Sequence, residues 1–317
     1  MDRKLTHDHF PPKTQKILEG FFDSYQKITK QDVEILKTFR KLLEKQLKNP
    51  FQFEPYHKKV RSPFDYYQFG LDFVRPLIDL SHSRVTGLEN LKKIDDQLHK
   101  QENVILLANH QTETDPLAIS ILLENSHPHI GEKIIYVAGE RVVTDPLAIP
   151  FSMGCDLLCI YSKRYIHHPP EEKMQKQLHN KHTMELMSRL FKEGGKIIYV
   201  APSGGRDRRG PSGAVEIAPF DPASVEMMLL MAKKSGVITH FYPLTLATYD
   251  LLPPPETVQK ELGEARKAKR CPIYMDFREE FDMECFFGSD EKNKVLKRKM
   301  RAEAIWKIVK ETYERIK

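Results

Sequence analysis

Residues 104–116 read Val-Ile-Leu-Leu-Ala-Asn-His-Gln-Thr-Glu-Thr-Asp-Pro, an apolar run followed at once by polar residues. The run 104–108 has the length and composition of a buried β-strand. An Asp followed by Pro is common at a helix N-cap and first helical position, so Asp115 and Pro116 indicate the start of a helix. The stretch therefore predicts a strand, a polar turn that carries His110, and a helix. Ligands of α/β sheets bind at the carboxyl ends of strands, which is where His110 falls.

The same alternation of short apolar runs and helical patterns continues from residue 83 onward. Strands are expected at 104–108, 134–137, 157–161, 197–201, 238–246 and 272–277. Helices are expected at 116–124, 171–192, 222–234 and 290–316, the last with Ser289 as its N-cap. This pattern predicts a larger α/β domain over residues 83–317, with a mixed, mainly parallel sheet flanked by helices.

Residues 1–82 have a different texture and predict a small N-terminal helical bundle. Apolar residues recur at helical spacing over 14–28 and 33–47. Ser62 and Pro63 fit an N-cap and first position of a third helix that runs to Leu80, and Pro76 predicts a break within it. Nothing in residues 1–80 has the pattern of a strand.

Composition limits the class of protein further. The 317 residues are 40% hydrophobic and 30% charged, with a net charge of +6, which permits an anionic partner without requiring one. No apolar run approaches the ~20 residues that span a bilayer, and the N-terminus lacks the features of a signal or transit peptide. The four cysteines form no Cys-x-x-Cys pair, and no four-ligand metal set is evident. We expect a soluble intracellular protein without a metal.

His110 and Asp115 are candidates for a catalytic dyad. A neutral imidazole can accept a proton from an attacking hydroxyl, and a carboxylate on its other nitrogen fixes the tautomer. The alternative is a structural histidine beside a capped helix. The segment Thr-Asp-Pro-Leu-Ala-Ile occurs at 114–119 and again at 144–149, where Glu140 replaces the histidine. The Asp-Pro pattern alone is therefore no sign of catalysis.

A second candidate site follows the strand expected at 197–201. Residues 202–208 read Pro-Ser-Gly-Gly-Arg-Asp-Arg, and the guanidinium groups of Arg206 and Arg208 suit phosphate. The alternative is a flexible basic loop that faces water. Neither a Walker A loop nor a Gly-x-Ser-x-Gly nucleophile motif is present. A third basic segment, Ser162-Lys163-Arg164-Tyr165, also follows a strand, so in a parallel sheet all three loops would share one edge.

These residues together resemble the soluble glycerol-3-phosphate acyltransferases of plant plastids and some bacteria. Residues 109–116 look like that family's His-x4-Asp block, and residues 136–146 look like its second block. Residues 151–154, Ser162-Lys163, Tyr242-Pro243-Leu244 and Pro253–Pro255 continue the match. The most specific block is Ala-Pro-Ser-Gly-Gly-Arg-Asp-Arg at 201–208.

The resemblance implies acyl transfer from acyl carrier protein or coenzyme A to the sn-1 hydroxyl of glycerol 3-phosphate. It implies that His110 is the general base and that Asp115 orients it. Arg206 and Arg208 would bind the phosphate, together with Lys163 and the two residues that follow it. At those two positions plant members have Lys-His, whereas this chain has Arg164 and Tyr165. Arg164 keeps a positive charge, while Tyr165 carries none at neutral pH.

The resemblance also bears on partners and location. No cofactor is expected beyond the thioester co-substrate. The basic start of the C-terminal helix, with Lys292, Lys294, Lys297, Arg298, Lys299 and Arg301, could dock acidic acyl carrier protein, contact a membrane surface, or simply face water. The cytoplasm and the plastid stroma are the two locations expected.

Two other functions fit part of the sequence. A lysophosphatidate acyltransferase shares His-x4-Asp but has membrane-embedding segments and a different arginine block. A non-catalytic phosphate- or nucleic-acid-binding protein would use the basic loops, yet aromatic residues do not interleave them and no nucleic-acid motif is present.

Overall fold

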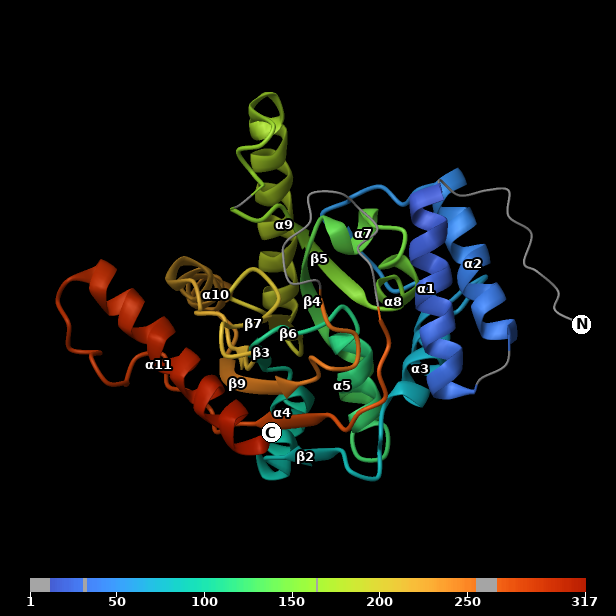
Figure 1. Ribbon diagram of the computed structural model, residues 1–317. Helices are drawn as coiled ribbons and strands as arrows, with labels where there is room; N and C mark the ends of the chain where they lie inside the picture. Colours follow the sequence, from blue (N-terminus) through green and yellow to red (C-terminus); the bar gives the residue numbers. More distant parts are fainter. Residues whose placement is uncertain (1–11, 31–32, 164, 255–266) are drawn as a thin grey trace, which may run out of the picture.

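A computed structural model describes residues 12–30, 33–163, 165–254 and 267–317 (Figure 1). Within these residues eight strands form one sheet in the order β1-β5-β4-β6-β3-β9-β10-β2. Their bounds in that order are Tyr56–His57, Asp156–Ile160, Ile135–Gly139, Ile197–Val200, Asn103–Ala108, Thr239–Ala247, Tyr274–Phe277 and Arg84–Thr86. The strands from β5 to β9 are mutually parallel, whereas β1 and β10 run antiparallel to their neighbours β5 and β9. The expected mixed, mainly parallel sheet is confirmed.

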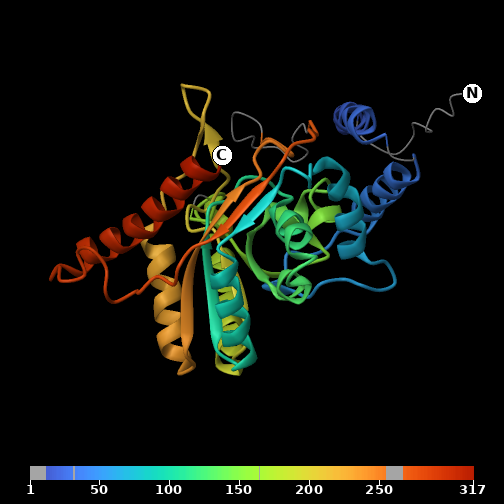
Figure 2. The ribbon, with the colours of Figure 1, turned by 90° about the horizontal axis from the view of Figure 1, so that it is seen from below.

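Helices cover both faces of this sheet. The α-helices are α1 (Pro12–Thr29), α2 (Val33–Lys48), α3 (Tyr66–Val74), α4 (Leu88–His99), α5 (Asp115–Leu123), α6 (Pro128–Lys133), α7 (Arg141–Thr144), α8 (Ile149–Ser152), α9 (Lys173–Glu193), α10 (Pro222–Ser235) and α11 (Lys294–Ile316). Helices α9, α10 and α11 pack on one face, and α4, α5 and α6 pack on the other. Figure 2 shows the N-terminal helices at one side of the molecule and α11 at the opposite side.

The central strand β3 shows why both faces are covered. Ile105 and Leu107 belong to the cluster of buried side chains under α9–α11, whereas Val104 and Leu106 belong to the cluster under α4–α6. All four side chains are fully buried. A parallel strand buried on both faces is apolar throughout, and this explains the unbroken apolar run in the sequence.

The N-terminal helices form an outer layer that shares its core with α5 and α8. Phe39 of α2 lies 5.2 Å from Phe73 of α3 and 5.6 Å from Phe151 of α8, measured between ring centroids. Gly154, just after α8, permits close approach, because a Cβ there would lie 2.4 Å from backbone atoms of Tyr67. Aromatic packing thus fixes the helical layer against the sheet domain.

Three local expectations were wrong. Tyr56 and His57 form a short strand within residues 1–80, paired with Leu158 and Leu157. The third helix begins at Tyr66, because the Asp65 side chain caps it by accepting from the Gln68 N–H. The C-terminal helix likewise begins at Lys294, where the Asn293 side chain accepts two backbone N–H groups. The caps expected from the sequence, Ser62 and Ser289, lie upstream of these starts, and the side chain that reaches the free N–H groups decides where a helix begins.

Other expectations hold or lie outside the description. The break at Pro76 is confirmed as a 3-10 turn over Arg75–Leu77. The strand β2 and the helix α4 were not expected from the sequence. Arg164 and Pro255 lie outside the described residues. No helix in the described part of the chain is both long and apolar enough to cross a membrane.

Candidate active site

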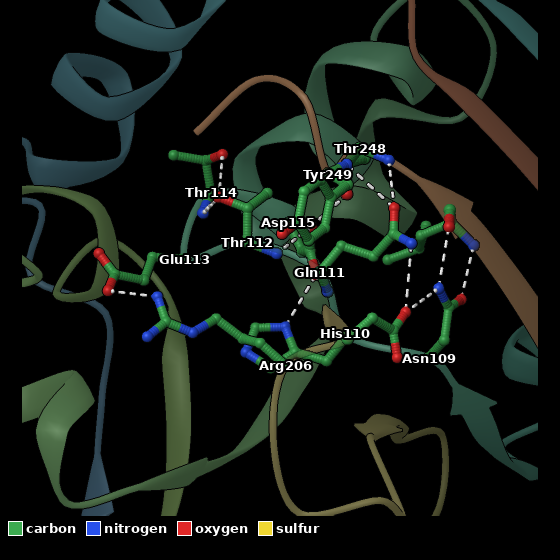
Figure 3. A network of polar contacts seen from close by, with 12 residues as sticks. Asn109, His110, Gln111, Thr112, Glu113, Thr114, Asp115, Arg206, Thr248 and Tyr249 are labelled. Atoms are coloured by element: carbon green, nitrogen blue, oxygen red, sulfur yellow. Dashed lines mark hydrogen bonds and ion pairs between the residues drawn. The ribbon is translucent and has the colours of Figure 1, made fainter. Parts of the chain in front are cut away.

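The polar turn and the basic loops all follow strands at the carboxyl edge of the sheet. His110 follows β3, the loop with Arg206 follows β6, and Lys163 follows β5. These three strands are parallel, so their ends meet at one edge. Figure 3 shows His110, Asp115 and Arg206 in one network of polar contacts. The sheet therefore brings together segments that are far apart in the sequence.

His110 and Asp115 are in direct contact across the turn. The Nδ1 atom of His110 lies 2.8 Å from Oδ2 of Asp115, which is the first residue of α5. The Asp115 side chain is 1% exposed, whereas the His110 side chain is 28% exposed. A carboxylate at Nδ1 favours the tautomer with its proton there. The Nε2 atom of His110, which has no hydrogen bond among the described residues, is then left with a lone pair.

Further donors hold the Asp115 carboxylate in place. Its Oδ2 atom also accepts the Gln111 backbone N–H at 2.8 Å. Its Oδ1 atom accepts the Thr248 hydroxyl at 2.6 Å and the Thr112 backbone N–H at 3.2 Å. These bonds stabilise a buried negative charge and fix the orientation of the imidazole.

The second copy of the repeated hexapeptide, at 144–149, lies in a different structural context from the copy at 114–119. Asp145 lies between α7 and α8 and does not follow a strand directly. Its carboxylate accepts the backbone N–H of Leu147 at 3.0 Å. The two copies of the hexapeptide therefore do not form two equivalent strand-to-helix corners.

Arg206 lies beside the histidine turn. Its guanidinium donates to Oε1 of Glu113 at 3.0 Å, and both side chains are mostly buried. Arg208 begins the short strand β7 (Arg208–Arg209), which pairs with β8 (Val215–Glu216), and its guanidinium donates to the Asp207 carbonyl at 3.3 Å. The loop thus presents Arg206 close to His110, with Arg208 two residues further on.

The described residues of the third basic segment contact α10 and α9. Lys163 is 72% exposed and forms an ion pair of 2.6 Å with Asp221, the N-cap of α10. The Tyr165 carbonyl accepts the ammonium of the buried Lys176 at 3.4 Å. These contacts join Lys163 to the start of α10 and Tyr165 to α9. Lys163 and Tyr165 thus follow β5 at the same edge of the sheet and connect it to α10 and α9.

Several residues of the network had no role in the sequence prediction. Asn109, Gln111 and Asp207 are fully buried polar residues, and Thr248 is 1% exposed. Burial raises the pKa of Asp207 to about 6. The signal available in the sequence was their position, since polar residues that directly follow a buried strand have to find partners inside the protein. In the described part of the chain, no group of three or more His, Cys, Asp or Glu side chains is placed to hold a metal ion.

Comparison with known proteins identifies the class to which this fold and site belong. The model of the Acyltransferase family matches residues 82–247, which is more than half of the chain, so the chain belongs to that family. Among curated proteins, it is 41% identical over 221 residues to the chloroplastic glycerol-3-phosphate acyltransferase of Arabidopsis thaliana, an alignment that covers 69% of this chain and 48% of the relative. The corresponding protein of Pisum sativum is 44% identical over 221 residues, with the same coverage.

A longer alignment reaches the protein named chloroplastic glycerol-3-phosphate acyltransferase in Carthamus tinctorius. It is 38% identical over 275 residues, which cover 83% of this chain and 59% of that protein. The chain spans about half the length of the first two relatives.

Proposed function

We propose that this protein is a glycerol-3-phosphate 1-O-acyltransferase, which transfers an acyl group from a thioester to the sn-1 hydroxyl of glycerol 3-phosphate. The observation that carries the proposal is the contact between His110 and Asp115 at the sheet edge, next to Arg206. The names of the relatives support the choice of acceptor.

The proposed reaction needs no covalent enzyme intermediate. Arg206 and Arg208, together with Lys163 and Arg164 from the segment that follows β5, hold the phosphate and bring the hydroxyl to Nε2 of His110. Nε2 takes the proton while the hydroxyl oxygen attacks the thioester carbonyl. The tetrahedral intermediate then expels the thiolate, which receives the proton back from His110. The products are lysophosphatidate and the free thiol.

Asp115 acts through His110 in this mechanism. When Nε2 takes up the proton, the imidazole becomes a cation, and the carboxylate at Nδ1 stabilises it. The described surroundings of Asp115 suit this role, because its oxygens are held by Gln111, Thr112 and Thr248.

For the thioester, we propose acyl carrier protein as the donor, with coenzyme A as the alternative. Near the start of α11, Lys292, Lys294 and Lys299 are exposed, and so are the apolar Val295 and Leu296. Such a surface suits an acidic protein. Arg301 does not belong to it, since this side chain is buried against Glu226. A membrane surface remains the other candidate partner for these cations.

The alternatives have less support. A phosphate- or nucleic-acid-binding protein without activity does not account for a histidine held by a buried carboxylate, nor for the family. A lysophosphatidate acyltransferase would share the dyad, but the relatives above carry the name of the glycerol-3-phosphate enzyme. Their names also favour the plastid over the cytoplasm as the location.

The test is an acyl-transfer assay with labelled glycerol 3-phosphate and acyl thioesters of both carriers. We expect the wild type to form lysophosphatidate and His110→Ala to lose turnover. Labelled lysophosphatidate offered as the acceptor in parallel distinguishes the alternative enzyme. A folded wild-type protein that acylates neither acceptor would refute the proposal.

A further inference from the structure

A buried carboxylate, that of Asp207, lies between Arg206 and Arg208 in the sequence. Asp207 is fully buried. Its Oδ2 atom accepts the side-chain amides of Asn109 at 2.9 Å and of Gln111 at 3.2 Å. Its Oδ1 atom accepts the Ala218 backbone N–H at 3.0 Å. The Asp207 backbone N–H donates to the carbonyl of His110 at 2.7 Å. Asp207 thus contacts the histidine turn through both its backbone and its side chain.

The two amides continue the network to a third segment. Asn109 donates to the Leu246 carbonyl at 2.9 Å and accepts the Leu246 N–H at 2.8 Å. The Gln111 carbonyl oxygen accepts the backbone N–H groups of Thr248 and Tyr249, at 2.7 and 3.0 Å. Figure 3 shows Gln111 reaching Thr248 and Tyr249, and Asn109 in the same network. The ends of β3 and β9 and the loop after β6 are therefore joined by buried hydrogen bonds.

We propose that Asp207 is a positioning residue, which fixes Arg206 and Arg208 relative to His110 through its hydrogen bonds to Asn109 and Gln111. The inference rests on the proposed function, because it concerns the alignment of the phosphate site with the base. Asp207 acts through its neighbours: each arginine is joined to it by a peptide bond, and His110 is flanked by its two amide partners. A shift of Asp207 would therefore change the position of both arginines relative to His110.

The position requires a group that only accepts hydrogen bonds. Three donors converge on the side chain, and the partners present no acceptor in return. An ionised carboxylate satisfies all three, whereas an amide would turn its own N–H groups toward at least one of these donors. Burial raises the pKa of Asp207 to about 6, and the hydrogen bonds to Ala218, Asn109 and Gln111 oppose that rise. The fold therefore keeps a charge here against the cost of desolvation, which a purely space-filling role would not need.

The test compares Asp207→Asn, Gln111→Glu and the double variant. Asp207→Asn should raise the KM for glycerol 3-phosphate and lower kcat, each by about 10-fold or more, because a buried donor is left facing donors. The KM for the acyl thioester should not change, because the proposed role of Asp207 concerns only the phosphate site and the base. Gln111→Glu alone places two carboxylates in contact and should also impair the enzyme.

The double variant should recover part of the loss. The carboxylate introduced at position 111 can accept from the amide introduced at position 207 and still accept the N–H groups of Thr248 and Tyr249. The expected result is a double variant less impaired than the product of the two single effects. Asp250→Asn is the matched control, because this carboxylate pairs with Arg209 of the same loop at the surface, and it should have wild-type kinetics.

Other outcomes separate the two proposals. If the wild type transfers acyl groups and folded Asp207→Asn has the same KM and kcat, with only a lower melting temperature, the positioning role is refuted while the proposed function stands. If Asp207→Asn does not fold, the double variant is compared with Gln111→Glu: a lower KM for glycerol 3-phosphate in the double variant supports the role, and a KM that is equal or higher refutes it. If the wild type has no activity, calorimetry with glycerol 3-phosphate decides, since equal affinity in wild type and variant would refute the alignment of the arginines.

Discussion

Replacing Asp115 with Asn tests the proposed dyad most directly, because it removes one charge and almost no volume. The carboxylate accepts His110 Nδ1 and the Gln111 N–H on one oxygen, and the Thr248 hydroxyl and the Thr112 N–H on the other. The new amide has two orientations. With its N–H₂ toward Thr248, whose hydroxyl can accept, the carbonyl oxygen still faces His110. With its N–H₂ toward His110, it donates to Nδ1 and moves the imidazole proton to Nε2.

The two orientations predict different losses. In the first, His110 keeps its tautomer, but the imidazolium donates to a neutral carbonyl instead of a charged carboxylate. A bond to a charged group contributes ~1.5–3 kcal/mol and a neutral one ~0.5–1.5 kcal/mol, so the difference of about 1–1.5 kcal/mol should lower kcat by roughly 5- to 12-fold at ~1.4 kcal/mol per tenfold. In the second, Nε2 cannot accept a proton, and the whole contribution of the base is lost, about 10²- to 10⁴-fold. The Thr248 hydroxyl favours the first orientation, so we expect the smaller loss.

The assay is steady-state acyl transfer with both substrates varied. The KM for glycerol 3-phosphate should change little, because Asp115 does not hold the phosphate in the proposed mechanism. Asp145→Asn is the matched control, since it makes the same change in the same hexapeptide at a carboxylate that is also buried but has no histidine five residues before it. A folded Asp115→Asn enzyme with more than about a third of the wild-type kcat would refute the role of this carboxylate, because the smallest expected loss is about fivefold.

The described contacts lead to four further expected outcomes. Arg206→Ala should raise the KM for glycerol 3-phosphate by about 10-fold or more in initial-rate measurements, and an unchanged KM would remove this residue from the phosphate site. Lys294→Glu with Lys299→Glu should raise the KM for acyl carrier protein thioesters, more at low salt, but not for coenzyme A thioesters; equal effects on both donors would argue against docking at α11. Gly154→Ala should destabilise the protein by about 1–3 kcal/mol in urea unfolding, because its Cβ would meet α3 backbone at 2.4 Å, and unchanged stability would contradict that packing. The pKa of Asp207, about 6, lies above the ordinary 3.8, so the folded protein should take up a proton there as the pH falls from about 7 to about 5. Over that fall in pH, the unfolding free energy of the wild type should rise by about 1 kcal/mol relative to Asp207→Asn. A difference between the two proteins that does not change with pH would contradict the raised pKa.

A strand or helix could be predicted from the sequence where many successive residues are buried or repeat at a regular spacing. The strand β3 was evident because six successive buried positions require apolar side chains or a satisfied Asn103. The strands β1 and β2 were missed because they have two and three residues, too few to establish an alternation. Helix starts were misplaced for a related reason: a single capping side chain, Asp65 or Asn293, decides the boundary, and several nearby residues could cap equally well by type.

In the candidate site, contacts between residues close in sequence could be predicted, and contacts between distant residues could not. His110 and Asp115 are joined within one turn, so their meeting could be anticipated from a strand, a short spacing and a helix start. The ion pair of Arg206 with Glu113 joins residues 93 positions apart, and the bond from Asn109 to Asp207 spans 98. Which buried donor meets which acceptor at that separation depends on the order of the strands. In this sheet β6 lies directly beside β3. The pattern of apolar residues within either strand does not indicate which other strand will pair with it.

The position of β6 beside β3 also explains why the proposed site needs more residues than His110 and Asp115. A histidine and an aspartate can be brought together by one turn, but the proposed base and the proposed phosphate-binding arginines follow different strands. Their relative position must therefore be held by residues outside both groups. Asn109, the residue before His110, bonds to Asp207 and to the backbone of Leu246, so one side chain connects the ends of β3 and β9 with the arginine loop. Each of these polar groups is buried and would destabilise the fold if left unpaired. The hydrogen bonds that satisfy these groups are therefore the same ones that set the distance between the proposed base and the arginines.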